Sequence, residues 1–476
     1  MKKRKNFYVI LITVSVYILL SWFIKAGNFN NGAYSGTGFN QLGILDLLLA
    51  PINLFNYFAV SMTKNIDGYV NQFAYGNIII AFIAMGALYG TLNKTGAYNR
   101  LVVDIAKKFE NKKVGFLIVM AIIFYVLSSL TGLELVLFMF VPFVGAVLSK
   151  MKFNKVTAFS ATIGAMLFGR LGSLYNPSIN GLNQVIIGTG INSGIIARII
   201  IFIILGIILG ATLYLTREKE VSKEEDILLL EDVKDNKKSY VPIIVSSVVV
   251  TLVLLVFMYN WYYMFNTTKV TDAFNNMMGV QVKNYTFMHN LFGMTESFGY
   301  WTGFTMSVLL LIQTLIIKFI YNIKLEDYAE GIKKSISDLI PMIGFSILSL
   351  SVIVLSLNSA DSFIYTIINE LCGLVSNEQA VGVFLSSILH SFFINDYFAL
   401  LSSLAPAFTT IYNGGSTEKM VLVTQVAHGF VSLISPLNVY LVAGLTFFGI
   451  SFKDWFKYIW KALLIILGVS IIILMI

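Results

Sequence analysis

The stretch GRLGSLYNPSING, residues 169–181, interrupts a long apolar region with one arginine, three glycines, two serines, two asparagines and a proline. Proline removes a backbone donor and breaks a helix, and lipid offers no partner for the N–H and C=O groups that a break sets free. A second stretch, FVSLISPLNVYLVAG at residues 430–444, places a Ser/Pro/Asn cluster in another apolar region. The surrounding segments, 156–190 and 419–450, are each too long for one helix. Both are therefore predicted to be membrane helices that are broken in the middle.

The composition is that of an integral membrane protein. Of the 476 residues, 57% are hydrophobic and 12% are charged, whereas soluble domains are about 25% charged. The mean hydropathy is +0.79. Apolar runs of about 20 residues favour helices over a transmembrane barrel, whose strands alternate over about ten residues. The single cysteine, Cys372, excludes an intramolecular disulfide framework and a cysteine-rich metal site. The predicted fold class is an all-α polytopic membrane protein.

Apolar segments of spanning length or close to it recur along the chain. They cover residues 7–24, 78–93, 195–216, 241–260, 299–320, 338–357 and 459–476. Two further segments, 114–149 and 380–409, each consist of two short apolar stretches around a polar centre. The centres are SSLTGLE at 128–134 and FFINDYF at 392–398. Each segment is predicted to be a re-entrant hairpin, with two full spans joined by a tight turn as the alternative.

The positions of the basic residues predict the orientation. Of the 33 lysines and arginines, 26 fall in segments on one side of the predicted spans, and the positive-inside rule makes that side cytoplasmic. The first apolar run is long for a secretion signal and no A-x-A-like site follows it, so it is read as an uncleaved span. We expect a multi-pass protein of a bacterial plasma membrane, with a cytoplasmic N-terminus and an external C-terminus. The net charge of +8 resides in the loops, so membrane lipid, and no nucleic acid, is the expected partner.

The two halves of the chain are predicted to repeat one order of elements in opposite orientation. Residues 77–216 form the first inverted repeat and residues 337–476 the second. Each runs span, hairpin, broken helix, span. The other segments are a first transmembrane helix with an external or interfacial segment (1–76), a cytoplasmic linker (217–240), and connecting helices with an external loop (241–336).

Inverted repeats that contain broken helices are typical of secondary transporters, which bind a small molecule near the midplane of the membrane. The ends of half-helices carry partial charges of about +0.5 and −0.5 that face such a site. No Gly-x-x-x-x-Gly-Lys-Ser/Thr loop occurs, so coupling to Na⁺, to H⁺ or to a counter-substrate is expected rather than coupling to ATP. No resident cofactor is expected.

Two other function classes remain as remote alternatives, a membrane-embedded enzyme and a passive channel. The motif HSFFIND places His390 six residues before Asp396, one residue longer than the His-x4-Asp pairing of some acyltransferases. No Gly-x-Ser-x-Gly or His-Glu-x-x-His motif is present. Neither class requires two broken helices of opposite orientation.

Arg170 lies one turn before the first break. An arginine at the centre of a membrane costs about 2.5–3.5 kcal/mol on insertion scales, so it requires a partner or a function. Its planar guanidinium is suited to hold a substrate carboxylate bidentately. Alternatively it pairs with Glu134, which the hairpin would place at the same depth. Both interpretations stay open on sequence grounds.

The predicted hairpin tips carry Glu134 and Asp396 in matching positions, where either carboxylate is suited to bind a cation, carry a proton or hold a substrate amine. His428 is a third candidate for coupling, because histidine titrates near physiological pH. The predicted substrate-binding residues are Arg170, Glu134, Asn176, Ser178, Asn395, Asp396, Ser435 and Asn438. Ion or proton coupling is assigned to Glu134, Asp396 and His428. Pro177 and Pro436 are predicted to break the helices, and a Na⁺ ion at the hairpin tips would use Ser129, Thr131 and Asn395.

Four stretches carry a resemblance to a known family. They are LLLAPINLFNYF (47–58), ALYGTLNKTGAYNRLV (87–102), GSLYNPSINGLNQVIIG (172–188) and SLISPLNVYLVAGLTFFGISFKDWFKYIWK (432–461). In these stretches the chain resembles the anaerobic four-carbon dicarboxylate carrier and basic amino-acid antiporter branch of the ion transporter superfamily. The resemblance implies a scaffold with a moving transport domain, a homodimer, and substrates such as dicarboxylates, arginine and ornithine.

The chain departs from that family's pattern at four places. Relatives tend to carry paired acids where this chain has only Glu134, and an acid where it has His428. Their second hairpin tip is rich in small residues, in contrast to the tip that holds Asp396, and a neutral residue is usual at the position of Arg170. An added arginine and fewer acids favour an anion or a zwitterion as substrate. The expected function is therefore secondary transport of an amino acid or a dicarboxylate, with an arginine/ornithine-type antiporter as the alternative.

Overall fold

The computed structural model describes residues 2–30, 33–63, 75–216, 229, 238–265, 267–282, 285–293, 297–357, 361–374, 379–411 and 417–475. Within these ranges, eight helices are long and apolar enough to cross a membrane. They are α1 (Lys2–Phe23), α3 (Gly76–Lys94), α5 (Lys113–Thr131), α10 (Ile195–Thr216), α11 (Val241–Met258), α15 (Gly303–Ile320), α16 (Leu325–Leu357) and α22 (Phe452–Met475). The predicted fold class, an all-α polytopic membrane protein, is confirmed.

The first hairpin and the first broken helix follow α3. A short helix, α4 (Ala97–Lys108), and a 3₁₀ turn, η1 (Glu110–Lys112), lead into α5. The chain then turns at Gly132 and returns through α6 (Glu134–Met139) and α7 (Val141–Lys150). The broken helix consists of α8 (Lys155–Phe159), η2 (Ser160–Gly164), α9 (Ala165–Leu171), η3 (Pro177–Gly181) and η4 (Asn183–Ile187), of which η2, η3 and η4 are π-helical. The break lies between α9 and η3.

The second half contains a corresponding pair of elements. Helix α17 (Phe363–Leu374) follows α16, and the second hairpin comprises α18 (Gln379–Phe393) and α19 (Tyr397–Ile411). The second broken helix comprises α20 (Thr417–Ser432) and α21 (Val439–Phe448), which precede α22. Both halves therefore contain a hairpin followed by a broken helix, in the predicted order. That the two halves have opposite orientations stays a prediction.

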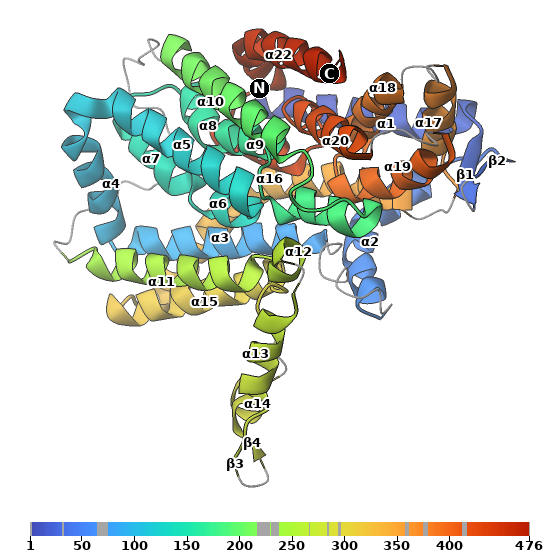
Figure 1. The fold of residues 1–476 in the computed structure, drawn as a ribbon. Helices are drawn as coiled ribbons and strands as arrows, with labels where there is room; N and C mark the ends of the chain where they lie inside the picture. The colour runs from blue at the N-terminus through green and yellow to red at the C-terminus, as the bar shows by residue number, and fades with distance from the viewer. Residues whose placement is uncertain are drawn as a thin grey trace.

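The remaining elements surround this arrangement. A two-stranded antiparallel sheet of β1 (Ala26–Asn30) and β2 (Ala33–Gly38) precedes α2 (Ile44–Thr63), and a bridge joins Gly27 of β1 to Ser362 before α17. The segment between α11 and α15 contains α12 (Trp261–Phe265), α13 (Lys269–Met278), the strands β3 (Gln281–Val282) and β4 (Tyr285–Thr286), and α14 (Phe287–Phe292). Figure 1 shows that α13, α14 and these strands project from the body of the molecule.

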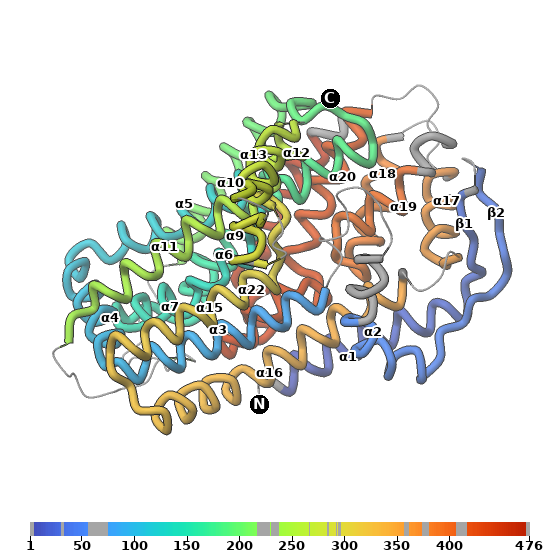
Figure 2. The backbone as a smooth tube through the Cα atoms, turned by 90° about the horizontal axis from the view of Figure 1, so that it is seen from below, coloured from blue at the N-terminus to red at the C-terminus, as the bar shows by residue number. Residues whose placement is uncertain are grey.

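Helices α3 and α16 lie side by side, as Figure 2 shows. They approach each other closely at two glycines, because a Cβ added to Gly90 would lie 2.3 Å from the carbonyl oxygen of Gly331. Small residues allow membrane helices to approach this closely and to gain van der Waals contact. Helix α15 packs against α3 as well, so α3 lies between α15 and α16.

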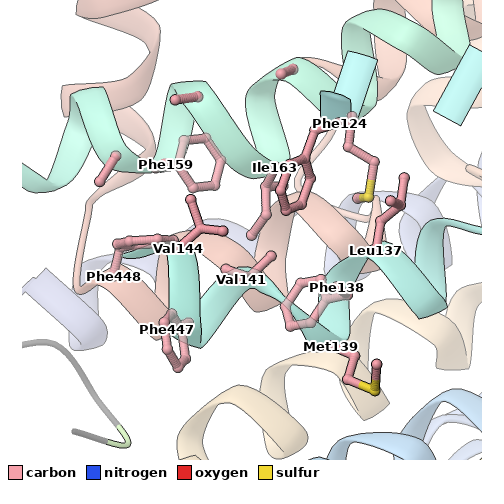
Figure 3. Close-up of a cluster of buried hydrophobic side chains, with 14 of the residues drawn as sticks. Phe124, Leu137, Phe138, Met139, Val141, Val144, Phe159, Ile163, Phe447 and Phe448 are labelled. Carbon is pink, nitrogen blue, oxygen red and sulfur yellow. The ribbon is translucent and has the colours of Figure 1, made fainter. Parts of the chain in front are cut away.

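The first broken helix and α21 share one apolar core, which Figure 3 shows. The ring of Phe159 meets Phe448 of α21 at 6.0 Å and Trp455 of α22 at 4.8 Å between centroids, both edge to face. A Cβ at Gly444 would lie 2.2 Å from Ile163, so α21 rests closely on η2. Burial of large side chains between these elements holds the two broken helices at a fixed distance from each other.

The predicted boundaries agree with the helices to within a few residues at the hairpins and breaks. The span predicted at 338–357 is the second part of a longer helix, because α16 already begins at Leu325. The predicted external loop contains short helices and strands. Most of the predicted cytoplasmic linker, 217–240, lies outside the described residues.

Candidate functional site

The two hairpin tips and the two helix breaks meet around one cavity of about 220 Å³. Six of the eight predicted substrate-binding residues line it, together with Thr131 and Pro177. The six are Glu134, Arg170, Ser178, Asn395, Asp396 and Asn438. The ends of α3, α11 and α15 close the cavity, through Tyr75, Asn77, Met258, Asn260 and Gly299–Gly303. Residues from both halves of the chain therefore contribute to a single site.

Asn176 builds the first break. It is the N-cap of η3, where its Oδ1 accepts a 2.8 Å hydrogen bond from the backbone N–H of Ser178. Its Nδ2 donates to the carbonyl of Ser128 at 3.2 Å and to Oε1 of Glu134 at 3.3 Å. The side chain itself is fully buried. Asn176 thus caps the second half-helix and fixes the carboxylate at the first hairpin tip, without lining the cavity.

The turn at the first hairpin tip depends on Gly132. Its φ of +64° lies in the left-handed region, and a Cβ there would lie 2.1 Å from Oδ1 of Asn176. Both conditions require glycine, because other residues pay a steric cost at positive φ and a side chain would displace Asn176.

Asn438 builds the second break in a corresponding way. It is the N-cap of α21, where its Oδ1 accepts from the N–H of Leu441 at 2.8 Å. Its Nδ2 donates to Oδ1 of Asn395 at 2.7 Å, and the same oxygen accepts from the hydroxyl of Ser432 at 3.1 Å. Ser435 is buried and donates to the carbonyl of Phe392 at 2.8 Å. It therefore ties the break to the hairpin and does not line the cavity.

Arg170 enters the cavity from the last turn of α9. Its Nε is buried and has no hydrogen-bond partner among the described residues. The ion pair with Glu134 is absent from the described part of the structure, since no acidic oxygen there lies within 4.0 Å of the Arg170 nitrogens. Its positive charge nevertheless acts on Asp396 and on the hydroxyl of Tyr440. The guanidinium thus faces the cavity as a cation whose donors are left unused by the described residues.

The carboxylates at the two hairpin tips make different hydrogen bonds. Asp396 lies directly before α19, and its Oδ1 accepts from the backbone N–H of Ala399 at 2.8 Å, as an N-cap does. Glu134 instead accepts side-chain hydrogen bonds, from Asn176 and from the hydroxyl of Ser128 at 3.4 Å. By its contact with the break, Asn395 is the counterpart of Glu134. The sequence pattern alone could not show which of the adjacent residues Asn395 and Asp396 contacts the break.

His428 lies behind the cavity rather than in it. Its side chain is fully buried, and Nδ1 shares a 3.0 Å hydrogen bond with the hydroxyl of Ser391 on the second hairpin. Its ring meets that of Tyr397 edge to face at 5.2 Å, and Nε2 has no partner among the described residues. Tyr397 lines the cavity, so one ring separates His428 from the site.

The oxygens proposed for Na⁺ already take part in protein hydrogen bonds. The hydroxyl of Ser129 donates to the carbonyl of Gly172 at 3.0 Å, and that of Thr131 donates to Leu127 at 2.6 Å. Ser129 and Thr131 belong to the first hairpin tip, and Asn395 belongs to the second. The described residues contain no group of three or more His, Cys, Asp or Glu side chains that could hold a metal.

Sequence reasoning missed two kinds of residue. The first kind is aromatic: the cavity is lined by Tyr75, Tyr300, Trp301 and Tyr440, and of these only Tyr440 lay in a stretch predicted to be a helix break or a hairpin tip. Arg198 was also missed. It is buried in α10 and donates to three backbone carbonyls, those of Leu174, Ile191 and Ser193, at 2.7, 2.5 and 2.7 Å. A lone arginine in an apolar helix was the signal that could have found it.

Three comparisons place the chain among known proteins. A family model described as "C4-dicarboxylate anaerobic carrier" matches residues 4–476. No curated protein matches the chain. Among solved structures, the YdaH transporter of Alcanivorax borkumensis is 11% identical with a TM-score of 0.40, over 99% of this chain and 97% of that one. MtrF of Neisseria gonorrhoeae, described as one of a class of antimetabolite efflux pumps, is 11% identical with a TM-score of 0.36, over 98% and 94%.

The family model covers almost the whole chain, including both hairpins and both breaks, and its members are carriers rather than enzymes. The chain belongs to the DcuC family of C4-dicarboxylate anaerobic carriers.

Proposed function

We propose that the chain transports a small dicarboxylate across the membrane and binds one of its carboxylates at Arg170. One observation carries the proposal: Arg170 lines the cavity, and its buried Nε has no hydrogen-bond partner among the described residues. A bare arginine in a membrane protein is costly, and a carboxylate satisfies its donors in a bidentate pair. The family name points to the same substrate class.

A second positive region supports binding of the other carboxylate. Helix α21 begins at the cavity, where Asn438, Val439 and Tyr440 line the wall. A helix N-terminus carries a partial charge of about +0.5 and favours anions within its first turn. The substrate would therefore bridge Arg170 of the first half and the N-terminus of α21 in the second half.

The charges of the cavity argue for coupling to cations. With their carboxyls ionised, Glu134 and Asp396 outnumber Arg170, and a bound dicarboxylate adds further negative charge. Burying unbalanced charge in a low-dielectric site is strongly unfavourable. We therefore propose that Na⁺ or H⁺ enters with the dicarboxylate, with Glu134, Asp396 and His428 as the groups that respond to it.

A second candidate substrate is an amino acid. The same observation, two carboxylates beside one guanidinium, suits a molecule with one carboxylate and one or two amines, because the amines offset the excess negative charge. Arginine or ornithine would then be exchanged without a coupling ion. One uptake assay distinguishes the two candidates, because uptake of the dicarboxylate requires a cation and exchange of the amino acid does not.

Alternating access would use the breaks and the hairpin tips. The tips rest on the breaks through Asn176 and Asn438, and the two halves meet around one cavity. Movement of one hairpin relative to the scaffold would expose the cavity to the other side of the membrane. Gly132 at the first tip and Gly172 at the first break allow backbone rotation at positions where the movement would occur.

The test is uptake of radiolabelled succinate, malate, arginine and ornithine into proteoliposomes, with and without gradients of Na⁺ and pH. We expect cation-dependent uptake of a dicarboxylate. Arg170→Ala should weaken its binding about 10- to 100-fold, as expected for the loss of charge-assisted hydrogen bonds. Arg170→Lys should recover only part of the affinity, because a lysine lacks the planar fork. If arginine or ornithine is taken up and no dicarboxylate is, the second candidate substrate is correct. Full activity of a folded Arg170→Ala would overturn the assignment of the binding site to Arg170.

A further inference from the structure

A second cavity, remote from the transport site, lies between α11 and the first hairpin. It has a volume of about 330 Å³ and is lined by residues of α3, α4, α6, α7, α11 and α15. For comparison, an apolar cavity of about 150 Å³ accommodates one benzene molecule, so this one has room for a body of about twelve carbon atoms. None of its described lining residues is charged. The cavity therefore favours a neutral and largely apolar occupant.

One wall of the cavity is formed by side chains at the surface of the membrane helix α11. Ile244, Val248 and Leu252 recur at intervals of four residues and are 41%, 51% and 57% exposed. Since α11 is one of the helices that can cross a membrane, this stripe faces the hydrocarbon of the bilayer. A molecule that enters beside the stripe therefore comes from the bilayer and not from water.

Two polar groups among the lining residues have no partner within the described part of the chain. They are the hydroxyl of Tyr98 and Oε1 of Gln313, each on a side chain only 2% exposed. Neighbouring polar groups are satisfied, since the hydroxyl of Tyr89 donates to the carbonyl of Met139 at 2.8 Å, and Nε2 of Gln313 donates to Ser247 at 3.3 Å. One donor and one acceptor thus remain, and an unsatisfied buried group costs about 1–3 kcal/mol.

We propose that this cavity binds a neutral, hydroxyl-bearing amphiphile of the bilayer, with an apolar body of about twelve carbon atoms. A hydroxyl group has one donor and two acceptor lone pairs, so it can accept from the Tyr98 hydroxyl or donate to Gln313 Oε1 where either group turns towards the cavity. A plain hydrocarbon would leave both groups unsatisfied. An anionic headgroup would find no cation among the described lining residues and would pay the cost of desolvation. The proposal concerns a separate site and does not depend on which substrate is transported.

The experiment uses the full chain in liposomes and a photoreactive dodecanol whose diazirine is in the alkyl chain. A photoreactive dodecane and a photoreactive dodecanoate serve as matched probes, and labelled peptides are mapped by mass spectrometry. We expect the alcohol to label the lining segments of α4 and α11 about 3- to 10-fold more than the alkane, which is the effect of one hydrogen bond. An excess of unlabelled 1-dodecanol should suppress this labelling. Equal labelling by alcohol and alkane, or stronger labelling by dodecanoate, would overturn the proposal.

Three variants locate the site. Val248→Trp would fill the cavity from an exposed position and should abolish the labelling, whereas Val249→Trp should not, because Val249 is equally exposed at 53% and does not line the cavity. Tyr98→Phe removes only the unpartnered hydroxyl and should reduce labelling by the alcohol towards that by the alkane. Labelling that persists in a folded Val248→Trp, or an unchanged preference for the alcohol in Tyr98→Phe, would contradict the assignment.

Discussion

Asn438 donates a 2.7 Å hydrogen bond from Nδ2 to Oδ1 of Asn395, and this bond joins the second helix break to the second hairpin tip. Asn176 makes the corresponding bond in the first half, to Glu134 at 3.3 Å. In both cases the other amide atom, Oδ1, caps the half-helix that follows the break. One asparagine in each half therefore fixes the direction of a half-helix and the position of a tip residue.

Replacing Asn438 separates these two tasks. Asn438→Asp keeps an oxygen to cap α21 and loses the donor to Asn395, whereas Asn438→Ala loses both. The loss of an N-cap costs about 0.5–2 kcal/mol, so the alanine variant should have the lower free energy of unfolding, measured by thermal unfolding in detergent. Uptake should fall strongly in both variants, because both release the tip. A folded Asn438→Asp with full uptake would show that the contact between tip and break is not required for transport.

A substitution at Gly132 tests the first hairpin tip. Gly132→Ala places a Cβ at positive φ and 2.1 Å from Asn176. Gly188→Ala is the matched control, because Gly188 has a φ of +82° and no atom lies within 4 Å of its added Cβ. Each variant pays the conformational cost of about 1–2 kcal/mol for alanine in this region, and only Gly132→Ala also displaces Asn176. Uptake by proteoliposomes should be lost in Gly132→Ala and retained in Gly188→Ala. Similar losses in the two variants would assign the effect to backbone strain alone.

The sequence was sufficient to locate the breaks and the tips, because proline, asparagine and charge inside apolar runs have few physical explanations in lipid. Arg170, Glu134 and Asp396 were found in this way, and the structure places all three around one cavity. Which tip residue meets which break was not predictable. Asn395 and Asp396 are adjacent, and only the fold decides that the first contacts Asn438 and the second caps α19.

The aromatic side chains that line the cavity were also not predictable from the sequence. In a chain with 38 phenylalanines and 24 tyrosines, no local pattern separates a tyrosine that faces a cavity from one that faces lipid or core. Tyr300 and Trp301 were assigned to the start of the span predicted at 299–320, and they reach the site only because α15 begins beside the first hairpin. Such positions depend on contacts between segments far apart in the sequence.

Tyr440 should contribute to substrate affinity. It lies in the first turn of α21, lines the cavity, and is close enough to Glu134, Arg170 and Asp396 to interact with all three charges. Tyr440→Phe removes a hydrogen-bond donor without a change of shape. We expect the KM for uptake to rise about 3- to 10-fold, as for one hydrogen bond, with little change in the maximal rate. Phe138, which meets the ring of Tyr440 at 6.4 Å, provides a control, since Phe138→Leu should affect stability more than KM. An unchanged KM in Tyr440→Phe would place the substrate away from α21.

The role of His428 is tested by the pH profile of uptake. If the buried imidazole exchanges protons during transport, His428→Gln should flatten the profile, because glutamine keeps a polar group beside Ser391 and cannot titrate. His390→Gln is the matched control, since His390 is equally buried and shares a 3.1 Å hydrogen bond with the hydroxyl of Ser403, within the second hairpin. It should reduce the rate without a change in the shape of the profile. A profile that remains unchanged in a folded His428→Gln would assign the histidine to packing against Tyr397 and leave Glu134 and Asp396 as the groups that couple transport to protons.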